Sequence, residues 1–331
     1  MVRRLLAVLL LLATSCGGRP FAEGSSRDLT IITALPQNAP EILLLRAIVE
    51  RTAIRIDEEA AYTVRFASPG DAGAYRARHL LLVGFGGEED VPTPFRKLYA
   101  LWRSGRRPPG SEASPAREPF VFMPDPWLRG QTAGIVWAET RDDWIPAVAA
   151  AQNRLFHALD RATFAGVRTR LDALPRDASA EREIADALGI TIRVPSGVRV
   201  LLDREHGAAL LLEEGPPARL LRVRVLSEAP PENAHAARDE LARLFRPDER
   251  TLDLEEPLLS PDVMVGATRQ VHGRWEDGAV SAAGPYRYYE VTRGATRLQV
   301  DLAVFAPGRP KLPYLRELHA IAETIAPRGG G

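Results

Sequence analysis

A glycine-rich segment, Gly84-Phe85-Gly86-Gly87, follows an apolar run and is one of the few places in the chain where chemistry could be expected. In such loops, backbone N–H groups bind phosphates where a strand gives way to a helix. The dinucleotide fingerprint G-x-G-x-x-G fails here because Glu89 occupies its last position, and no Lys-Ser/Thr pair follows as in a P-loop. Glu88 and Asp90 add negative charge that would repel a phosphate. The segment is therefore predicted to be a glycine turn that leaves a strand.

The histidines, serines and carboxylates form no catalytic or metal-ligating signature. The six histidines include no H-E-x-x-H or H-x-H pattern, and no G-x-S-x-G elbow is present. A single cysteine excludes a Cys-based zinc site and an intrachain disulfide. Neighbouring acids such as Asp142-Asp143 and Glu255-Glu256 are typical of solvated faces or helix starts. The sequence thus indicates no catalytic residue, no metal ligand and no cofactor.

Three aromatic residues form the candidate binding surface: Trp275, Tyr286 and Tyr288. They fall in neighbouring predicted strands, where Tyr286 and Tyr288 share one face and Tyr289 points to the other. Such a group could bind a glycan or a peptide. Packing inside the sheet is the competing interpretation, because aromatic side chains favour strands and cores.

The N-terminus carries the clearest chemical signal, which centres on Cys16. Arg3 and Arg4 precede an unbroken apolar run over Leu5–Ala13, too short for the roughly 20 residues that a membrane-spanning helix needs. This pattern is typical of a signal peptide. Small residues before the sole cysteine resemble the bacterial lipobox, in which the thiol receives diacylglyceryl and the chain is cut before it. Ala13 stands where Leu is usual.

We therefore expect residues 1–15 to be a lipoprotein signal peptide and Cys16 to be the lipidated residue. The Gly/Ser/Pro-rich residues that follow predict a flexible tether over 16–28. No Asp follows Cys16, which in a Gram-negative cell is compatible with transfer to the outer membrane, facing the periplasm. The alternative is an ordinary signal peptide with Cys16 incidental. On the first interpretation the protein is exported and contacts a membrane through its lipid anchor.

Length and composition indicate a folded protein without an overall electrostatic field. The chain has 331 residues, 45% hydrophobic and 26% charged, which is ordinary for globular proteins. Lys+Arg and Asp+Glu both number 43, so the net charge is zero and a nucleic-acid partner is not expected. A length above roughly 250 residues favours two domains.

The first half mixes strands and helices and predicts an N-terminal α+β domain over residues 29–176. Buried or alternating strands are expected over 29–33, 62–66, 79–85 and 132–139. Asn38 is expected to cap a helix, and a long helix is expected over about 142–174. The Pro/Arg-rich residues near 103–119 predict a mobile loop.

The second half predicts a C-terminal α+β domain over residues 177–327. A helix over 178–188 should end at Gly189, and further helices are expected over 233–245 and 312–325. Strands are expected over 198–202, 208–212, 221–225, 263–275, 286–291 and 297–304. The fold class is therefore α+β with two domains, the second a mostly antiparallel sheet covered by helices.

Three stretches of the second half carry a family resemblance: residues 189–197 (GITIRVPSG), Gly273-Arg274-Trp275 with Gly284-Pro285-Tyr286, and the strand that ends in Val304-Phe305-Ala306-Pro307 before the closing helix. With the lipobox, they resemble domain-of-unknown-function family 4837, a set of bacterial envelope lipoproteins. Ala282-Ala283 departs from the glycine expected there. The resemblance implies export and lipidation, and it implies no activity and no functional residues.

Two hypotheses of function follow. The first is a non-enzymatic envelope lipoprotein that binds a partner, which could be an envelope protein, or supports an assembly. The second is an envelope hydrolase or carbohydrate-active protein whose site the sequence does not reveal, because a cleft between two domains is a common ligand site.

Overall fold

The computed structural model describes residues 19–54, 59–105, 118–228, 230–252 and 264–328. Of the chain, 33% is helical and 35% is strand. The fold therefore mixes helices and strands, as the sequence predicts. Cys16, the proposed signal peptide and residues 106–117 of the Pro/Arg-rich segment lie outside the described residues.

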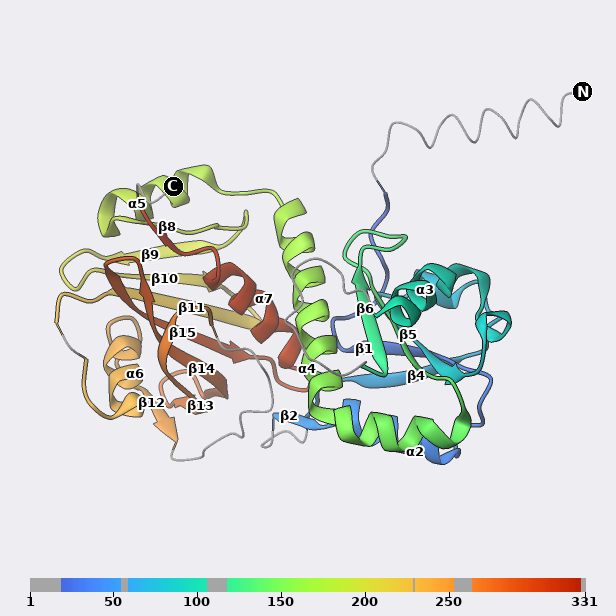
Figure 1. Cartoon of the computed structure of the whole chain (residues 1–331). Coiled ribbons are helices and arrows are strands. Elements are labelled where there is room, and N and C mark those ends of the chain that lie inside the picture. Colours follow the sequence, from blue (N-terminus) through green and yellow to red (C-terminus); the bar gives the residue numbers. More distant parts are fainter. Residues whose placement is uncertain (1–18, 55–58, 106–117, 229, 253–263, 329–331) are drawn as a thin grey trace, which may run out of the picture.

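The first sheet has five strands in the order β4-β1-β5-β7-β6 (Figure 1). Its strands are β1 (Asp28–Ile32), β4 (Thr63–Ala67), β5 (His79–Phe85), β6 (Phe120–Pro124) and β7 (Thr132–Ala138). All neighbours are parallel except β6, which runs antiparallel to β7. Parallel strands are covered on both faces, which explains the continuous apolar sequence of β5. A two-stranded ladder of β2 (Thr52–Ile54) and β3 (Glu59–Ala60) lies beside this sheet.

Helices cover both faces of the first sheet. One face packs on α3 (Arg96–Ser104), through a cluster that includes Leu80, Ile135 and Trp102. The other face packs on α2 (Pro40–Val49) and α4 (Arg141–Ala173), whose apolar side chains belong to the largest core cluster.

The second sheet has seven strands in the order β12-β13-β14-β15-β11-β10-β9, and every neighbouring pair is antiparallel. The strands are β9 (Arg199–Asp203), β10 (Ala208–Glu213), β11 (Ala218–Val225), β12 (Glu249–Leu252), β13 (Ala267–Asp277), β14 (Ala282–Arg293) and β15 (Thr296–Phe305). One face packs on α6 (Ala234–Arg243) and the other on α7 (Leu312–Ala322). Helix α5 (Ala178–Leu188) leads into β8 (Ile190–Thr191), which pairs with β16 (Ala326–Pro327).

Helix α4 lies between the two sheets and joins them (Figure 1). One buried cluster contains Leu29 of the first sheet, Leu155 of α4 and Leu302 of the second sheet. Polar contacts add to this junction, because Glu59 accepts hydrogen bonds from the backbone N–H groups of Lys311 (2.7 Å) and Leu312 (3.0 Å) at the start of α7. A carboxylate at this end of a helix is favourable. The two halves therefore share a core.

Several elements match the sequence-based predictions closely. Strand β5 occupies the predicted residues 79–85, and α5 ends at Gly189, whose φ of +67° is readily adopted by glycine. Asn233 caps α6, since its Oδ1 accepts from the N–H groups of His235 (2.8 Å) and Ala236 (3.1 Å). Gly84 and Phe85 are the last residues of β5, and Gly86-Gly87 form the predicted glycine turn, in which the Gly87 N–H donates to Asp90 (3.1 Å).

Other predictions are corrected. The N-cap of α2 is Ala39 and makes no side-chain bond, so Asn38 does not cap this helix. Helix α3 and strand β6 were not expected from the sequence, although α3 buries Leu98, Tyr99 and Trp102 on one side. The long helix expected over about 142–174 is confirmed, since α4 runs from Arg141 to Ala173.

The predicted tether is also corrected, because residues 20–28 belong to the folded body. The Ala22 N–H donates to the Arg129 carbonyl (3.0 Å), and the Arg129 N–H donates to the Pro20 carbonyl (2.9 Å). Ala22 is only 2% exposed. The Phe21 ring lies under the guanidinium of Arg129, 4.6 Å from its centroid, which gives this segment a cation–π contact as well.

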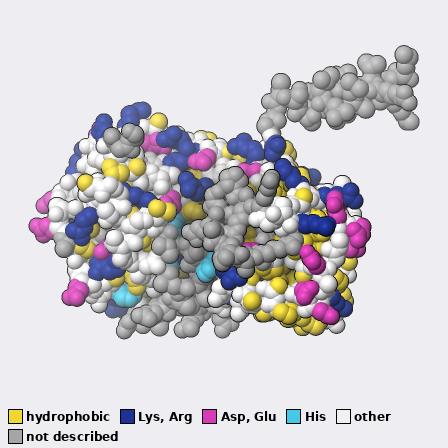
Figure 2. Space-filling model, viewed as in Figure 1, with side chains coloured by type: hydrophobic (Ala, Val, Ile, Leu, Met, Phe, Trp, Pro, Cys, Tyr) yellow, Lys and Arg dark blue, Asp and Glu magenta, His cyan; other side chains and the backbone are white. Residues whose placement is uncertain are grey.

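No helix within the described part of the chain is long and apolar enough to span a bilayer. The visible face of the molecule carries Lys/Arg and Asp/Glu side chains mixed together (Figure 2), consistent with the balanced charge of the sequence.

Candidate functional site

The three aromatic residues predicted as a binding surface are buried. Trp275 and Tyr288 are 0% exposed and Tyr286 is 1% exposed, in the cluster between the second sheet and α6. Both tyrosine hydroxyls have partners inside the protein: the Tyr286 hydroxyl lies 2.6 Å from Nδ1 of His235, and the Tyr288 hydroxyl donates to Glu290 at 3.0 Å. The buried Nε1 of Trp275 has no hydrogen-bond partner among the described residues. The expectation of an aromatic ligand surface is therefore corrected in favour of core packing, because α6 covers this face.

Beside these aromatic residues lies a buried ion cluster of Arg222, Arg238, Glu249 and Asp301. All four side chains are 0% exposed. Arg222 pairs with both carboxylates, and so does Arg238, whose Nε lies 3.3 Å from Asp301. Burial opposes the charge on Arg238, but Asp301 and Glu249 outweigh it and raise its pKa. Two positive and two negative charges balance, so we interpret the cluster as structural.

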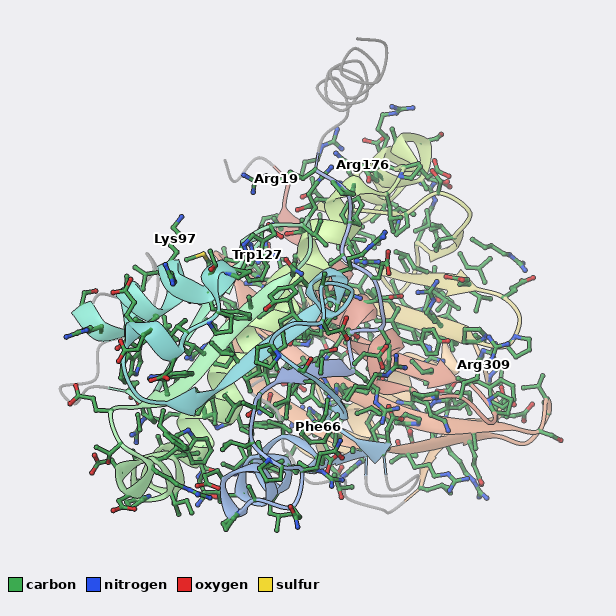
Figure 3. The ribbon with its side chains drawn as sticks, turned by 90° about the vertical axis from the view of Figure 1, so that its right-hand side faces the viewer. Arg19, Phe66, Lys97, Trp127, Arg176 and Arg309 are labelled. Atoms are coloured by element: carbon green, nitrogen blue, oxygen red, sulfur yellow. The ribbon has the colours of Figure 1, made fainter. Side chains whose placement is uncertain are left out.

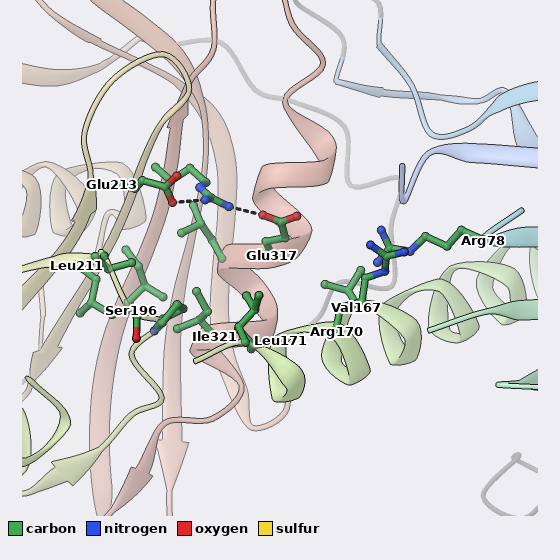
Figure 4. A pocket seen from close by; sticks show the side chains of 16 residues that line it. Arg78, Val167, Arg170, Leu171, Ser196, Leu211, Glu213, Glu317 and Ile321 are labelled. Atoms are coloured by element: carbon green, nitrogen blue, oxygen red, sulfur yellow. Dashed lines mark hydrogen bonds and ion pairs between the residues drawn. The ribbon is translucent and has the colours of Figure 1, made fainter. Parts of the chain in front are cut away.

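A cavity with a volume of about 370 Å³ lies between the two sheets (Figure 4). Ligand pockets of this kind span roughly 300–1,000 Å³. Helices α4 and α7, strands β10 and β11, the 195–198 segment and Arg78 line it. Its two ends differ, since Arg78 and Arg170 lie at one end and Ser196 and Leu211 at the other.

Arg78 is the unusual residue of this cavity. It precedes β5, is 6% exposed, and its Nε has no hydrogen-bond partner among the described residues. It also forms no ion pair with a described residue, and its side chain runs toward Glu317 (Figure 4). Burial first, and the nearby charge of Arg170 second, lower the pKa of Arg78 to about 10. An unpaired buried charge is costly, so this guanidinium needs an explanation.

Arg170 stands beside Arg78 and is tied to the N-terminal segment. Its Nη2 donates to the Ala22 carbonyl, and its guanidinium lies 5.5 Å from the centroid of the Phe21 ring. Its Nε is buried and unpartnered among the described residues. Burial lowers the pKa of Arg170.

The remaining charges of the cavity neutralise one another in part. Arg219 pairs with Glu213 and with Glu317. Burial raises the pKa of Glu317, against the opposite effect of Arg219, although the cavity leaves 44% of this side chain accessible.

A second buried cluster adjoins the arginine end of the cavity. The Tyr62 hydroxyl lies 3.2 Å from Asp160 and 3.0 Å from Thr163, both on α4. Arg316 of α7 pairs with Asp160, and its Nη1 donates to the Ser26 carbonyl at 2.7 Å. This cluster fixes α4, α7 and the start of the first sheet to one another, and thus fixes the cavity walls.

Within the described residues, no group of three or more His, Cys, Asp and Glu side chains is placed to hold a metal ion. The lipidation candidate Cys16 lies outside those residues.

No protein-family model matches the chain, and no curated protein matches it. Among solved structures, a crystal structure of a protein from Bacteroides thetaiotaomicron VPI-5482 is 11% identical with a TM-score of 0.24. The match covers 43% of this chain and 46% of that one, so it spans less than half of the length of that protein. A likeness at this level carries no argument about fold or function.

Proposed function

We propose that this protein is a lipid-anchored envelope protein that binds a small ligand in the cavity between its two sheets. Arg78 is the observation that carries the binding role, because its guanidinium is buried and its Nε has no partner among the described residues. A bound anion explains such a group more easily than a contribution to stability does. The anchoring role rests on the apolar run Leu5–Ala13 and on Cys16, the sole cysteine. Assembly with an envelope protein is compatible with the same anchor.

Replacing Cys16 with serine tests the anchor. We expect the wild-type protein to fractionate with membranes and to incorporate a labelled fatty acid, and we expect C16S to lose the label and most of its membrane association, because each buried CH₂ contributes about 0.8 kcal/mol. Ala13→Leu is the matched control, since it supplies the usual lipobox residue and should leave lipidation intact. Equal membrane association of wild type and C16S would refute the anchor.

Replacing Arg78 with methionine tests whether this residue serves stability. We expect the free energy of unfolding of the ligand-free protein to stay unchanged or to rise by about 1 kcal/mol, because the substitution removes a buried charge that forms no ion pair with any residue the structure describes. The control is Arg168→Met on the exposed side of α4. A loss above about 2 kcal/mol in denaturant unfolding, with no loss in the control, would show that Arg78 is structural.

The hydrolase alternative has one observation in its favour, the raised pKa of Glu317 in the cavity, which is a common property of catalytic acids. The ion pair between Glu317 and Arg219 argues against a role of Glu317 as a catalytic acid. Turnover of peptidoglycan, glycans or esters that disappears in Glu317→Gln would establish an enzyme. A screen without turnover would leave the binding role.

We also propose that the two sheets with their helices are separate domains divided near residue 176, and that the chain is related to family 4837. The shared core opposes full independence of the domains. Calorimetry that resolves two unfolding transitions would support the division, and one transition would oppose it. A solved member of the family that lacks this pair of sheets would contradict the relationship.

A further inference from the structure

The arginine end of the cavity has the chemistry of an anion site. Arg78 and Arg170 bring two guanidinium groups together, and the buried Nε atoms of both lack partners among the described residues. Like charges held together in a buried place repel each other, so an anion between them would relieve that repulsion. A guanidinium binds a planar carboxylate with two parallel hydrogen bonds, which makes this pair well suited to a carboxylate.

The charge balance of the cavity favours a ligand with a single negative charge. Three arginines and two glutamates line it, which leaves one positive charge when all are ionised. Arg219 is already paired with both glutamates, so the excess lies at Arg78 and Arg170. A monoanion would neutralise this excess, whereas a dianionic phosphate monoester would exceed it and face Glu317.

Most of the remaining wall is apolar. Side chains from α4, α7 and the second sheet line it: Val167, Leu171, Leu211, Leu221, Leu318 and Ile321. Leu174, Ser196 and Gly197 line the other end and are exposed, so this end forms the mouth. A ligand with a charged head at Arg78 would therefore place an apolar body along the cavity toward the mouth.

The mouth lies at the end of the molecule from which the N-terminal segment leaves. Arg176 pairs through a β-bridge with Pro195 of the cavity wall, and Figure 3 places Arg176 and Arg19 at the same end. Arg19 lies three positions after Cys16, a reach of at most about 11 Å. A lipid on Cys16 would thus hold the mouth close to the bilayer, where aliphatic anions are found.

We propose that the cavity binds an aliphatic carboxylate, whose carboxylate lies between Arg78 and Arg170 and whose chain lies among the apolar residues toward the mouth. This inference rests on the proposed binding function. In this account Arg78 selects for the charge of the ligand. The ligand enters from the membrane through the mouth of the cavity, which the lipid anchor holds near the bilayer.

The test is calorimetric titration of the full lipidated protein in phosphatidylcholine nanodiscs, with empty nanodiscs subtracted. Octanoate, octanol, octylammonium, octyl phosphate and acetate are the probes. We expect one octanoate per protein, binding at least about tenfold tighter than octanol or acetate, because only octanoate combines charge-assisted hydrogen bonds to the arginines with burial of an aliphatic chain. Arg78→Met should remove this advantage over octanol, and Arg168→Met should preserve it.

Each other result overturns the inference. Equal binding of octanoate and octanol, or unchanged octanoate binding in Arg78→Met, would show that the carboxylate is not recognised. Tighter binding of octyl phosphate would assign the site to phosphate esters. If octanoate does not bind but the protein extracted from its own envelopes carries another small molecule, the inference fails while the proposed function stands. If neither is found, both fail.

Discussion

Replacing Asp301 with asparagine is expected to lower the free energy of unfolding by about 3–5 kcal/mol. Asp301 is 0% exposed and pairs with both Arg222 and Arg238. Without the charge of Asp301, Arg222 and Arg238 would share the buried carboxylate of Glu249, and the partly exposed Asp239, 3.5 Å from Nη1 of Arg238, would compensate the second positive charge only in part. Removing one partner of a buried ion pair is strongly destabilising, because the other charge stays buried without compensation. Replacing the whole pair by apolar residues changes the stability much less.

Urea unfolding monitored by tryptophan fluorescence measures this loss. The matched control is Glu276→Gln, which breaks the exposed pair with Arg250, whose side chain is 68% exposed. That substitution should change stability by less than about 1 kcal/mol. Similar losses in the two variants would mean that Arg222, Arg238, Glu249 and Asp301 do not form a tightly coupled buried network.

The protein is expected to lose stability below pH 6.5, in large part through His79. This side chain is 0% exposed, and neither ring nitrogen has a partner among the described residues. Burial, followed by the charges of Arg78, Arg316 and Arg170, holds the pKa of His79 well below its usual 6.5. The unfolded chain therefore binds a proton near pH 6.5 that the folded protein does not, so stability is full above this pH and falls as the pH decreases.

The slope from one such group is about 1.4 kcal/mol per pH unit, or roughly 2 kcal/mol between pH 6.5 and pH 5. We expect His79→Leu to remove this part of the acid loss and to leave stability at pH 7.5 equal or higher, because it deletes two unsatisfied nitrogens. Glu317, whose pKa is raised, acts in the opposite direction but equally in both proteins. The control is His206→Gln in the exposed pair with Asp203, where the His206 side chain is 46% exposed.

Unfolding free energies measured from pH 5 to 7.5 test whether His79 causes this acid loss of stability. The difference between wild type and His79→Leu should grow steadily as the pH falls, while His206→Gln should follow the wild type. A constant difference across this range would mean that His79 takes up its proton alike in the folded and unfolded states, contrary to its burial.

Elements with a strong local pattern could be predicted from the sequence. Strand β5 is a continuous apolar run, and α5 combines an apolar stripe with a glycine at its end. Helix α3 has only nine residues and adjoins a Pro/Gly-rich segment, so its short helical pattern is hard to distinguish from the loop composition beside it. The tether was misjudged because Phe21 and Ala22 pack on distant residues that the local composition does not reveal.

Alternation along strands predicted which residues share a face but not what covers that face. Arg222 and Asp301 alternate with apolar residues and look like solvent-facing positions, yet α6 covers them and Arg238 and Glu249 join them. The aromatic residue Tyr286 was misplaced for the same reason. A long arginine opposite an acid on neighbouring strands, Arg222 opposite Asp301, was the only available signal, and it needs the strand register to be seen.

The candidate cavity could not be predicted, because its residues meet only in three dimensions. Arg78, Arg170 and Glu317 come from the start of β5, the end of α4 and the middle of α7. In the sequence, Arg78 is an ordinary charged residue before an apolar strand. Only the folded structure shows that Arg78 is buried beside α4 and α7 and that its Nε has no partner among the described residues.

Native mass spectrometry of the lipidated protein, extracted gently from its own envelopes, tests the central claim most directly. We predict a small-molecule adduct of defined mass on the wild-type protein, absent from Arg78→Met and retained in Arg168→Met. A wild-type protein that carries only its lipid, or an adduct that persists without Arg78, would contradict the account of the cavity as a ligand site.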